Sequence, residues 1–152
     1  MTPADHRKPF VGAWRLLRYE YRRADGKLTL PFGEGPVGLL IYDALGHMAG
    51  QLMRPGRAPF RKNSITAGTI EEVRAAFEGY IAYCGAYGVD AQAGAVIHHV
   101  TASWFPNFVG TDQVRYFEFQ ENRLLLRTPP RESGSEKRAG LLVWERVSET
   151  AR

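Results

Sequence analysis

Two adjacent histidines, His98 and His99, are the residues of this sequence best suited to acid–base or ligand-binding chemistry. An imidazole can act as a general base, orient a ligand or bind a metal ion. Neighbouring residues of a strand point to opposite faces, so we expect one histidine to face the interior and the other to face solvent or a helix. The alternative is that both histidines are structural, one exposed to solvent and the other hydrogen-bonded inside the protein. Only His6 and His47 remain as further histidine ligands, in terminal and turn segments, so no metal site is predicted.

Two arginines, Arg54 and Arg57, flank the turn-forming pair Pro55-Gly56. A guanidinium can bind a carboxylate or an enolate through two parallel hydrogen bonds. Loops beside the mouth of a pocket commonly carry ligand contacts, so both arginines are candidate ligand-binding residues. The alternative is that they are solvated loop side chains.

Five further residues are candidates for the lining of an interior cavity, because aromatic walls with a few polar groups are typical of small-molecule sites. They are Tyr42, Gln51, Met53, Trp104 and Tyr116. The alternative is that they only fill the interior. The sequence has no nucleophile-elbow serine and no glycine-rich phosphate loop, so no catalytic residue is assigned.

The elements that must position these side chains are mainly strands. The chain of 152 residues contains 16 Gly, 3 Trp, 7 Tyr and 8 Phe, a composition typical of turn-rich β-structure. In the first apolar run the apolar face changes near Leu16 and Leu17, which indicates either a bulge or a strand covered on both faces. Apolar runs bounded by turn residues predict strands at 11–23, 27–30, 37–42, 46–53, 95–105, 111–120, 123–128 and 137–147.

One helix is predicted at about 69–87. Thr69 and Glu72 have the spacing of a capping box, and Gly88 is suited to end the helix. We expect this helix to cover the sheet, with Cys84 buried and inert on its apolar face. Apolar residues recur every three or four positions, at Ile70, Val73, Phe77, Tyr80, Ile81, Cys84 and Tyr87.

Short, mostly hairpin-linked strands predict an antiparallel barrel or a sandwich. We favour a mainly β, up-and-down barrel of about eight strands, because closure leaves no exposed edge. A barrel of this size encloses side chains or one small ligand. The length fits a single domain over 1–152, with disordered tails expected at about 1–9 and 148–152.

Short sequence blocks with a familiar pattern span nearly the whole chain. They are GAW at 12–14, PFGEGPVGLLIY at 31–42, QLMRP at 51–55, GYIAY at 79–83, HHV at 98–100, FPN at 105–107, GT at 110–111, TPP at 128–130 and LVWER at 142–146. Together these blocks resemble the bacterial and fungal lipocalin-like domain family. The resemblance implies a calycin-type β-barrel with one helix, of the kind that commonly holds small hydrophobic molecules. It also implies that Arg146 packs over Trp14 and closes one end of the barrel, so both residues are expected to be structural.

Charge and cysteine content limit the partners. Twenty Lys and Arg against 16 Asp and Glu give a net charge of +4 without a dense basic tract, so no nucleic-acid partner is predicted. No apolar run approaches the ~18 residues that span a bilayer, so no membrane partner is predicted. Cys84 is the single cysteine of the sequence, which suits a reducing compartment. We expect a cytoplasmic protein, and no cofactor is predicted.

Three functions remain open. The first is a binding protein that holds a small, largely apolar ligand with a polar or anionic end, oriented by Arg54, Arg57 and one of the two histidines. The second is an isomerase, cyclase or hydratase of the same shape, acting on a natural-product intermediate through one acid–base histidine. The third is an interaction module that forms a homodimer through strand edges or the helix.

Overall fold

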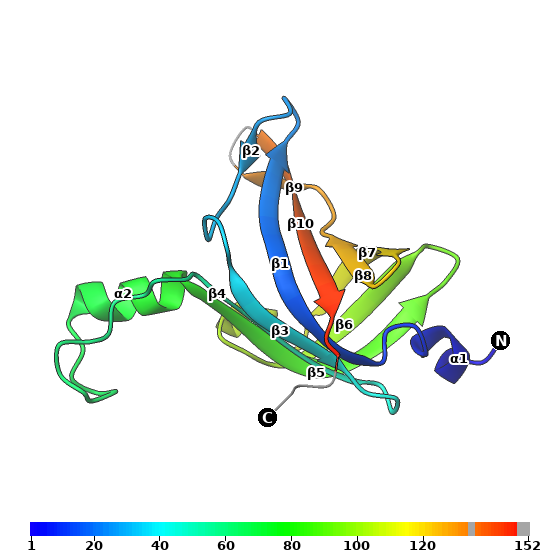
Figure 1. The fold of residues 1–152 in the computed structure, drawn as a ribbon, viewed down its shortest axis with the longest axis horizontal. Coiled ribbons are helices and arrows are strands. Elements are labelled where there is room, and N and C mark those ends of the chain that lie inside the picture. Colours follow the sequence, from blue (N-terminus) through cyan, green and yellow to red (C-terminus); the bar gives the residue numbers. More distant parts are fainter. Residues whose placement is uncertain (134–135, 149–152) are drawn as a thin grey trace.

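The computed structural model describes residues 1–133 and 136–148, which form one β-sheet and a few short helices (Figure 1). The helical segments are α1 (Pro3–Arg7), α2 (Ile70–Glu78) and the single 3-10 turn η1 (Pro106–Phe108). The strands are β1 (Gly12–Arg23), β2 (Leu28–Thr29), β3 (Val37–Tyr42), β4 (His47–Met53), β5 (Tyr80–Asp90), β6 (Ala95–Ser103), β7 (Asp112–Gln120), β8 (Arg123–Arg127), β9 (Arg131–Ser133) and β10 (Glu136–Arg146).

The sheet is antiparallel and closes on itself. Neighbouring strands follow the order β2-β1-β3-β4-β5-β6-β7-β8-β10-β9, and β1 also pairs with β10. Eight strands therefore make a closed barrel, while the short strands β2 and β9 extend β1 and β10 at one end. The prediction of a mainly β, up-and-down barrel of about eight strands is confirmed. The observed strands lie within a few residues of the predicted ones, except for β5 and the short β9, neither of which was predicted as a strand.

A bulge in β1 keeps one side of this long strand facing the barrel interior. The pairing of β1 with β10 changes register between Leu16 and Arg18, so Leu17 is the extra residue. Leu16 and Tyr19 are both buried, although their spacing would place them on opposite faces of a regular strand. Of the two alternatives for this strand, the bulge is therefore correct.

The second half of the predicted helix at 69–87 is wrong. Helix α2 ends at Glu78, Gly79 follows as its cap, and the chain continues as β5, which pairs with β4 and β6. Apolar residues at mixed spacings fit a strand as well as a helix, and the Tyr, Ile and Val of this segment favour strands. Hydrogen bonds to two neighbouring strands therefore override the helical pattern. Cys84, expected to be buried on a helix, is a half-buried free cysteine of β5.

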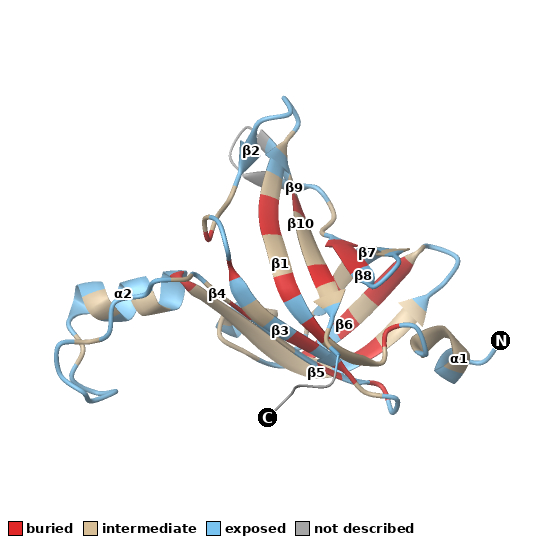
Figure 2. Ribbon diagram, viewed as in Figure 1, coloured by how far each residue is buried: buried red, intermediate tan, exposed pale blue. Residues whose placement is uncertain are grey.

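The first half of the predicted helix is correct, but α2 does not cover the barrel. In its capping box, Thr69 Oγ1 accepts from the Glu72 N–H (3.1 Å) and Glu72 Oε1 accepts from the Thr69 N–H (2.9 Å). Figures 1 and 2 show α2 on an arm that projects to one side of the barrel. Its apolar side chains are accordingly exposed, by 84% at Ile70, 52% at Val73 and 48% at Phe77. Helix α2 therefore adds none of these side chains to the barrel core.

One end of the barrel is closed by a tryptophan beneath an arginine. Trp14 is 1% exposed, and its indole N–H donates to the Phe10 carbonyl (2.9 Å). The Arg146 guanidinium carbon lies 4.2 Å from the centre of the Trp14 ring system. Arg146 also donates to the carbonyls of Pro9 (2.7 Å) and Val11 (2.8 Å), which fastens the segment before β1 to the end of β10. The expected contact between Trp14 and Arg146 is thus present.

The N-terminal residues differ from the disordered tail expected at 1–9, because they contain helix α1. Its capping box joins Thr2 and Asp5: the Asp5 N–H donates to Thr2 Oγ1 (3.2 Å), and the Thr2 N–H donates to Asp5 Oδ2 (2.9 Å). The helix leads into Phe10, which packs edge-on against Tyr42 and Phe117 inside the barrel. Of the other expected tail, residues 149–152 lie outside the described residues.

Candidate functional site

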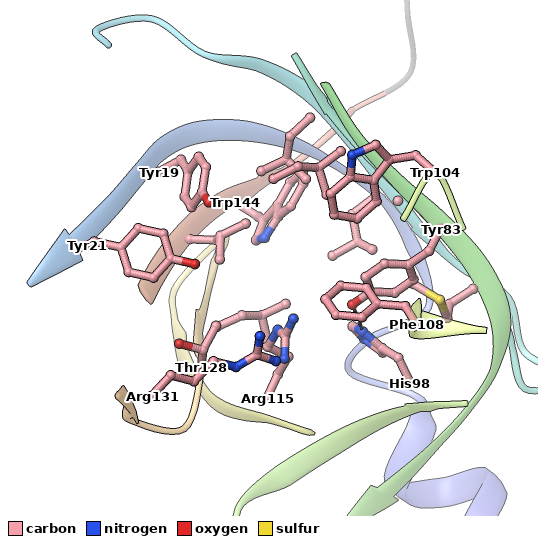
Figure 3. Close-up of a pocket in the computed structure, with 17 residues that line it drawn as sticks. Tyr19, Tyr21, Tyr83, His98, Trp104, Phe108, Arg115, Thr128, Arg131 and Trp144 are labelled. Carbon is pink, nitrogen blue, oxygen red and sulfur yellow. Dashed lines mark hydrogen bonds between the residues drawn. The ribbon is translucent and has the colours of Figure 1, made fainter. Parts of the chain in front are cut away.

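The barrel encloses a cavity of about 120 Å³. An engineered protein cavity of roughly 150 Å³ binds one benzene molecule, so the cavity has the size of a small aromatic ligand. Aromatic rings and aliphatic side chains make most of its wall, and a few polar groups share it (Figure 3). The lining residues are Tyr19, Tyr21, Leu40, Met48, Gly50, Leu52, Ile81, Tyr83, His98, Trp104, Phe108, Arg115, Leu126, Thr128, Arg131, Leu142 and Trp144.

Strand register decides which side chains reach this cavity. In the β3–β4 hairpin, Leu40 opposes Gly50 and Tyr42 opposes Met48. Directly opposed residues share a face of the sheet, and for these pairs it is the inner face. Gln51 follows Gly50, so it lies on the outer face and is exposed. Gln51 and Met53, which were nominated together with Tyr42, therefore lie on the outer face of β4 and cannot line the cavity.

His98 is the inward-facing histidine, and two tyrosines hold it. Its Nε2 lies 2.6 Å from the Tyr42 hydroxyl oxygen and its Nδ1 lies 2.6 Å from that of Tyr83. The side chain is only 2% exposed. Burial lowers the pKa of His98 to about 3, and the positive charge of Arg115 acts in the same direction. The imidazole is therefore neutral at physiological pH.

The donors and acceptors available set the direction of the two hydrogen bonds that join His98 to Tyr42 and Tyr83. A neutral imidazole has one donor and one acceptor nitrogen, so one tyrosine donates to His98 and the other accepts from it. Tyr42 is 1% exposed, and among the described residues its hydroxyl pairs with His98. If Tyr42 accepted, its own proton would be buried without an acceptor, at a cost of about 1–3 kcal/mol. Tyr42 therefore donates to Nε2, Nδ1–H donates to Tyr83, and the Tyr83 proton is left to be donated into the cavity.

Two arginines that were not predicted from the sequence, Arg115 and Arg131, make one side of the cavity positively charged (Figure 3). Arg115 of β7 is half-buried, and its Nη1 donates to the Val114 carbonyl (2.8 Å). Arg131 of β9 is exposed, and its Nη2 donates to Gln113 Oε1 (3.1 Å). Its guanidinium carbon lies 5.9 Å from the centre of the Phe108 ring. This charged side is therefore where the cavity approaches solvent.

A pattern in the sequence could have placed one of these arginines, Arg115, on the inner face of its strand. Arg115 alternates with Phe117 and Phe119, and residues two apart in a strand share a face. Both phenylalanine rings pack against the core, so the same alternation carries Arg115 inward. For Arg131, which follows two prolines and lies in a short strand, no periodic pattern assigned a face. Its position depends on the pairing of β9 with β10.

Trp144 of β10 places its indole N–H, a hydrogen-bond donor, at the cavity wall. The residue is 2% exposed and lines the cavity. Its indole N–H has no acceptor among the described residues. A buried donor without an acceptor costs about 1–3 kcal/mol, so a ligand oxygen that accepted this hydrogen bond would relieve that cost.

The candidate residues nominated from the strands divide between the two faces of the sheet. His98 and Trp104 line the cavity, and Tyr42 supports it through His98. His99 is exposed on the outer face, where its Nδ1 lies 2.6 Å from Asp112 Oδ1. Residues that do not line the cavity are Gln51, Met53, His99 and Tyr116.

The two nominated arginines also lie away from the cavity. Arg54 donates to the Pro31 carbonyl (2.8 Å) and its guanidinium carbon lies 5.7 Å from the centre of the Phe32 ring. Arg57 donates to the carbonyl of Ala76 in α2 (3.2 Å). Arg54 therefore anchors the loop before β3, and Arg57 anchors the arm that carries α2. Neither arginine lines the cavity.

The described part of the chain holds no cluster of metal ligands and no membrane-spanning helix. No three His, Cys, Asp or Glu side chains come together there in a way that could hold a metal ion. None of its helices is long and apolar enough to cross a membrane. The polar chemistry that the described residues offer the cavity is hydrogen bonding and positive charge.

An eight-stranded antiparallel barrel around a ligand-sized cavity is typical of small-molecule-binding β-barrels. Residues 11–147 match the lipocalin-like domain family, and the protein belongs to this family, as its sequence blocks indicated. The chain is also 35% identical over 108 residues to the 4'-hydroxy-3'-methoxypropiophenone carrier protein ppsC of Aspergillus oryzae, an alignment that covers 66% of this chain and 96% of that protein. No solved structure gives a significant match. The family and the carrier relative support a small-molecule binding role.

Proposed function

We propose that this protein is a carrier that holds one small aromatic molecule inside its barrel. The observation that carries the proposal is the cavity of about 120 Å³, whose wall is rich in aromatic rings and has polar donors on it. Burial of a ligand's apolar surface contributes about 25 cal/mol per Å², while a few placed polar groups fix its orientation. The aromatic lining residues are Tyr19, Tyr21, Tyr83, Trp104, Phe108 and Trp144.

The carrier relative supports the aromatic class of ligand. That protein is named as a carrier of a hydroxylated and methoxylated propiophenone, which is an aromatic ketone. An apolar molecule with a polar or anionic end, the ligand expected from the sequence, would place its ring among the aromatic side chains and its oxygen near the arginines. A cytoplasmic location, suited to the free Cys84, is part of the same proposal.

The geometry favours the carrier over the alternative enzyme. That enzyme needs an acid–base histidine, and His98 is the histidine that lines the cavity. Both of its ring nitrogens are engaged by tyrosine hydroxyls, and burial holds its pKa at about 3. A general base works best when its pKa lies near the operating pH, so His98 is poorly suited to remove a proton from a ligand.

Calorimetric titration with an aromatic ketone tests the carrier proposal. We expect para-methoxyacetophenone to bind with one molecule per barrel and palmitate not to bind, because the cavity accepts a ring and not a long alkyl chain. Ile81→Trp places a large side chain into the cavity and should abolish binding. Ile41→Trp is the matched control, since Ile41 is 43% exposed on the outer face of β3, and it should bind as the wild type does.

The carrier proposal would be wrong if para-methoxyacetophenone bound equally well to the wild type and to folded Ile81→Trp. Equal binding would place the ligand outside the barrel. Circular dichroism of both variants confirms that the barrel is intact, so that a loss of binding reports on the cavity rather than on unfolding.

A further inference from the structure

Nearly all of the polar groups that reach the cavity can donate a hydrogen bond. Arg115 and Arg131 have donors only. The indole N–H of Trp144 has no acceptor among the described residues, and the hydrogen-bond chain through His98 leaves the Tyr83 hydroxyl proton free. The described lining residues include neither Asp nor Glu. A ligand that complements this wall must supply acceptors.

The two cavity arginines differ from the ion-paired arginines on the outside of the barrel. Arg15 is paired with Glu145 at 2.6 Å and Arg127 with Glu118 at 3.1 Å. Arg115 and Arg131 have no carboxylate partner within 4 Å among the described residues; their hydrogen bonds run to a backbone carbonyl and to a side-chain amide. Figure 3 shows both guanidinium groups on the same side of the cavity. Two neighbouring cations without an anion repel each other, and a bound anion offsets that repulsion.

The remaining titratable groups that face the cavity leave this positive charge uncompensated at neutral pH. They are Tyr19 and Tyr21 from β1, Tyr83 from β5 and His98 from β6. Burial raises the pKa of both Tyr19 and Tyr83, so these hydroxyls stay protonated. Burial lowers the pKa of His98 to about 3, so the imidazole adds no charge of either sign.

The unpaired donor of Trp144 marks a second position for a ligand oxygen. In Figure 3, Trp144 lies across the cavity from Arg115 and Arg131, with the open space between them. A neutral acceptor such as a carbonyl oxygen would satisfy the indole N–H there. The wall thus presents charged donors at one side and a neutral donor at the other, separated by aromatic side chains.

We propose that the cavity binds its ligand as an oxyanion: an aromatic molecule whose ionised oxygen, a phenolate, lies against Arg115 and Arg131 and whose carbonyl oxygen accepts from Trp144. This inference rests on the proposed carrier function and adds the charge state of the ligand. A phenol that enters the site loses its O–H proton to the solvent, and the negative charge left on oxygen is held by the two guanidinium groups and the Tyr83 hydroxyl. Binding therefore lowers the pKa of the ligand's phenol.

Two probes that differ in one group test this inference. Para-hydroxyacetophenone has an ionisable phenol and para-methoxyacetophenone has none, while both keep the ring and the ketone. In slightly acidic buffer, where the free phenol is protonated, we expect wild-type protein to bring out the long-wavelength absorption band of the phenolate. Calorimetry in two buffers of different ionisation enthalpy should show proton release with the hydroxy probe and none with the methoxy probe.

Variants identify the groups that hold the charge. Arg115→Gln and Arg131→Gln should each weaken binding of para-hydroxyacetophenone by roughly tenfold to a hundredfold, because each removes a charge-assisted hydrogen bond. Both variants should leave the affinity for para-methoxyacetophenone nearly unchanged. Trp144→Phe should weaken both probes severalfold, since both carry the ketone. Arg57→Gln is the matched control, and it should bind both probes as the wild type does because Arg57 lies on the α2 arm.

The outcomes separate this inference from the carrier proposal. If para-methoxyacetophenone binds and para-hydroxyacetophenone binds with the spectrum of the neutral phenol, the oxyanion inference is overturned and the carrier proposal stands. Equal losses for the two probes in Arg115→Gln and Arg131→Gln would overturn it as well. If neither probe binds to the wild type, the carrier proposal fails and this inference fails with it.

Discussion

Replacing Trp14 by alanine should lower the free energy of unfolding by about 3–5 kcal/mol, the usual cost of deleting a buried tryptophan side chain. Trp14 is 1% exposed, its N–H is bonded to the Phe10 carbonyl, and Arg146 lies against its ring. Removal of the ring leaves a cavity at the closed end of the barrel and takes away the surface on which Arg146 packs. Urea denaturation followed by circular dichroism measures the loss.

A matched control for this prediction is Trp104→Ala. The same side-chain atoms are deleted there, but Trp104 is half-buried at the wall of the ligand cavity rather than in the closed core, so a smaller loss is expected. A Trp14→Ala protein with the thermal midpoint of the wild type would refute the structural role of Trp14. Arg146→Gln should cost less than Trp14→Ala, since a cation–π contact is worth about 0.5–2 kcal/mol.

Acidification should destabilise the protein through His98. The buried imidazole has a pKa of about 3 in the folded state, whereas its ordinary value is 6.5. Between these two values the unfolded chain binds a proton that the folded chain does not, so the free energy of unfolding falls as the pH decreases from 6.5 towards 3. Above 6.5 the histidine is neutral in both states and has no such effect. At pH 5 the loss from this one group is about 2 kcal/mol.

Urea denaturation at pH 7 and at pH 5 isolates this effect when variants are compared. His98→Gln keeps one donor and one acceptor for the two tyrosines but does not titrate, so it should lose about 2 kcal/mol less than the wild type between the two pH values. Identical pH dependence in wild type and His98→Gln would contradict the buried, neutral state of His98.

Local sequence patterns predicted most of the fold because most of its elements form between neighbours in the chain. The hairpin of β3 and β4 follows from two apolar runs around a turn, and the bulge at Leu17 is visible as a change of the apolar face. The capping box of Thr69 and Glu72 begins α2 where it was expected. The segment at 80–90 was misassigned because its apolar spacing fits both a helix and a strand. Pairing with β4 and β6, which local patterns do not contain, decided between them.

The candidate site was less predictable than the fold, because a residue lines the cavity only if its face of the strand turns toward the barrel interior. His98 and His99 are chemically identical in the sequence, and barrel closure places one in the core and the other beside Asp112. Arg54 and Arg57 were candidates because they follow an apolar strand, yet Arg54 binds the loop before β3 and Arg57 binds α2, and neither lines the cavity. Arg115 could have been found by its alternation with Phe117, whereas Arg131 required the pairing of β9 with β10.

The sequence by itself determined the lipocalin-like family, the set of barrel strands apart from β5, and the closed end where Arg146 meets Trp14. The tertiary structure alone decided that the barrel holds a cavity and that His98, Arg115, Arg131 and Trp144 face it. The physical reason is that strand formation and turns depend on neighbouring residues, whereas the lining of a barrel depends on register between strands far apart in the chain. A shift of one residue in that register exchanges the inner and the outer face.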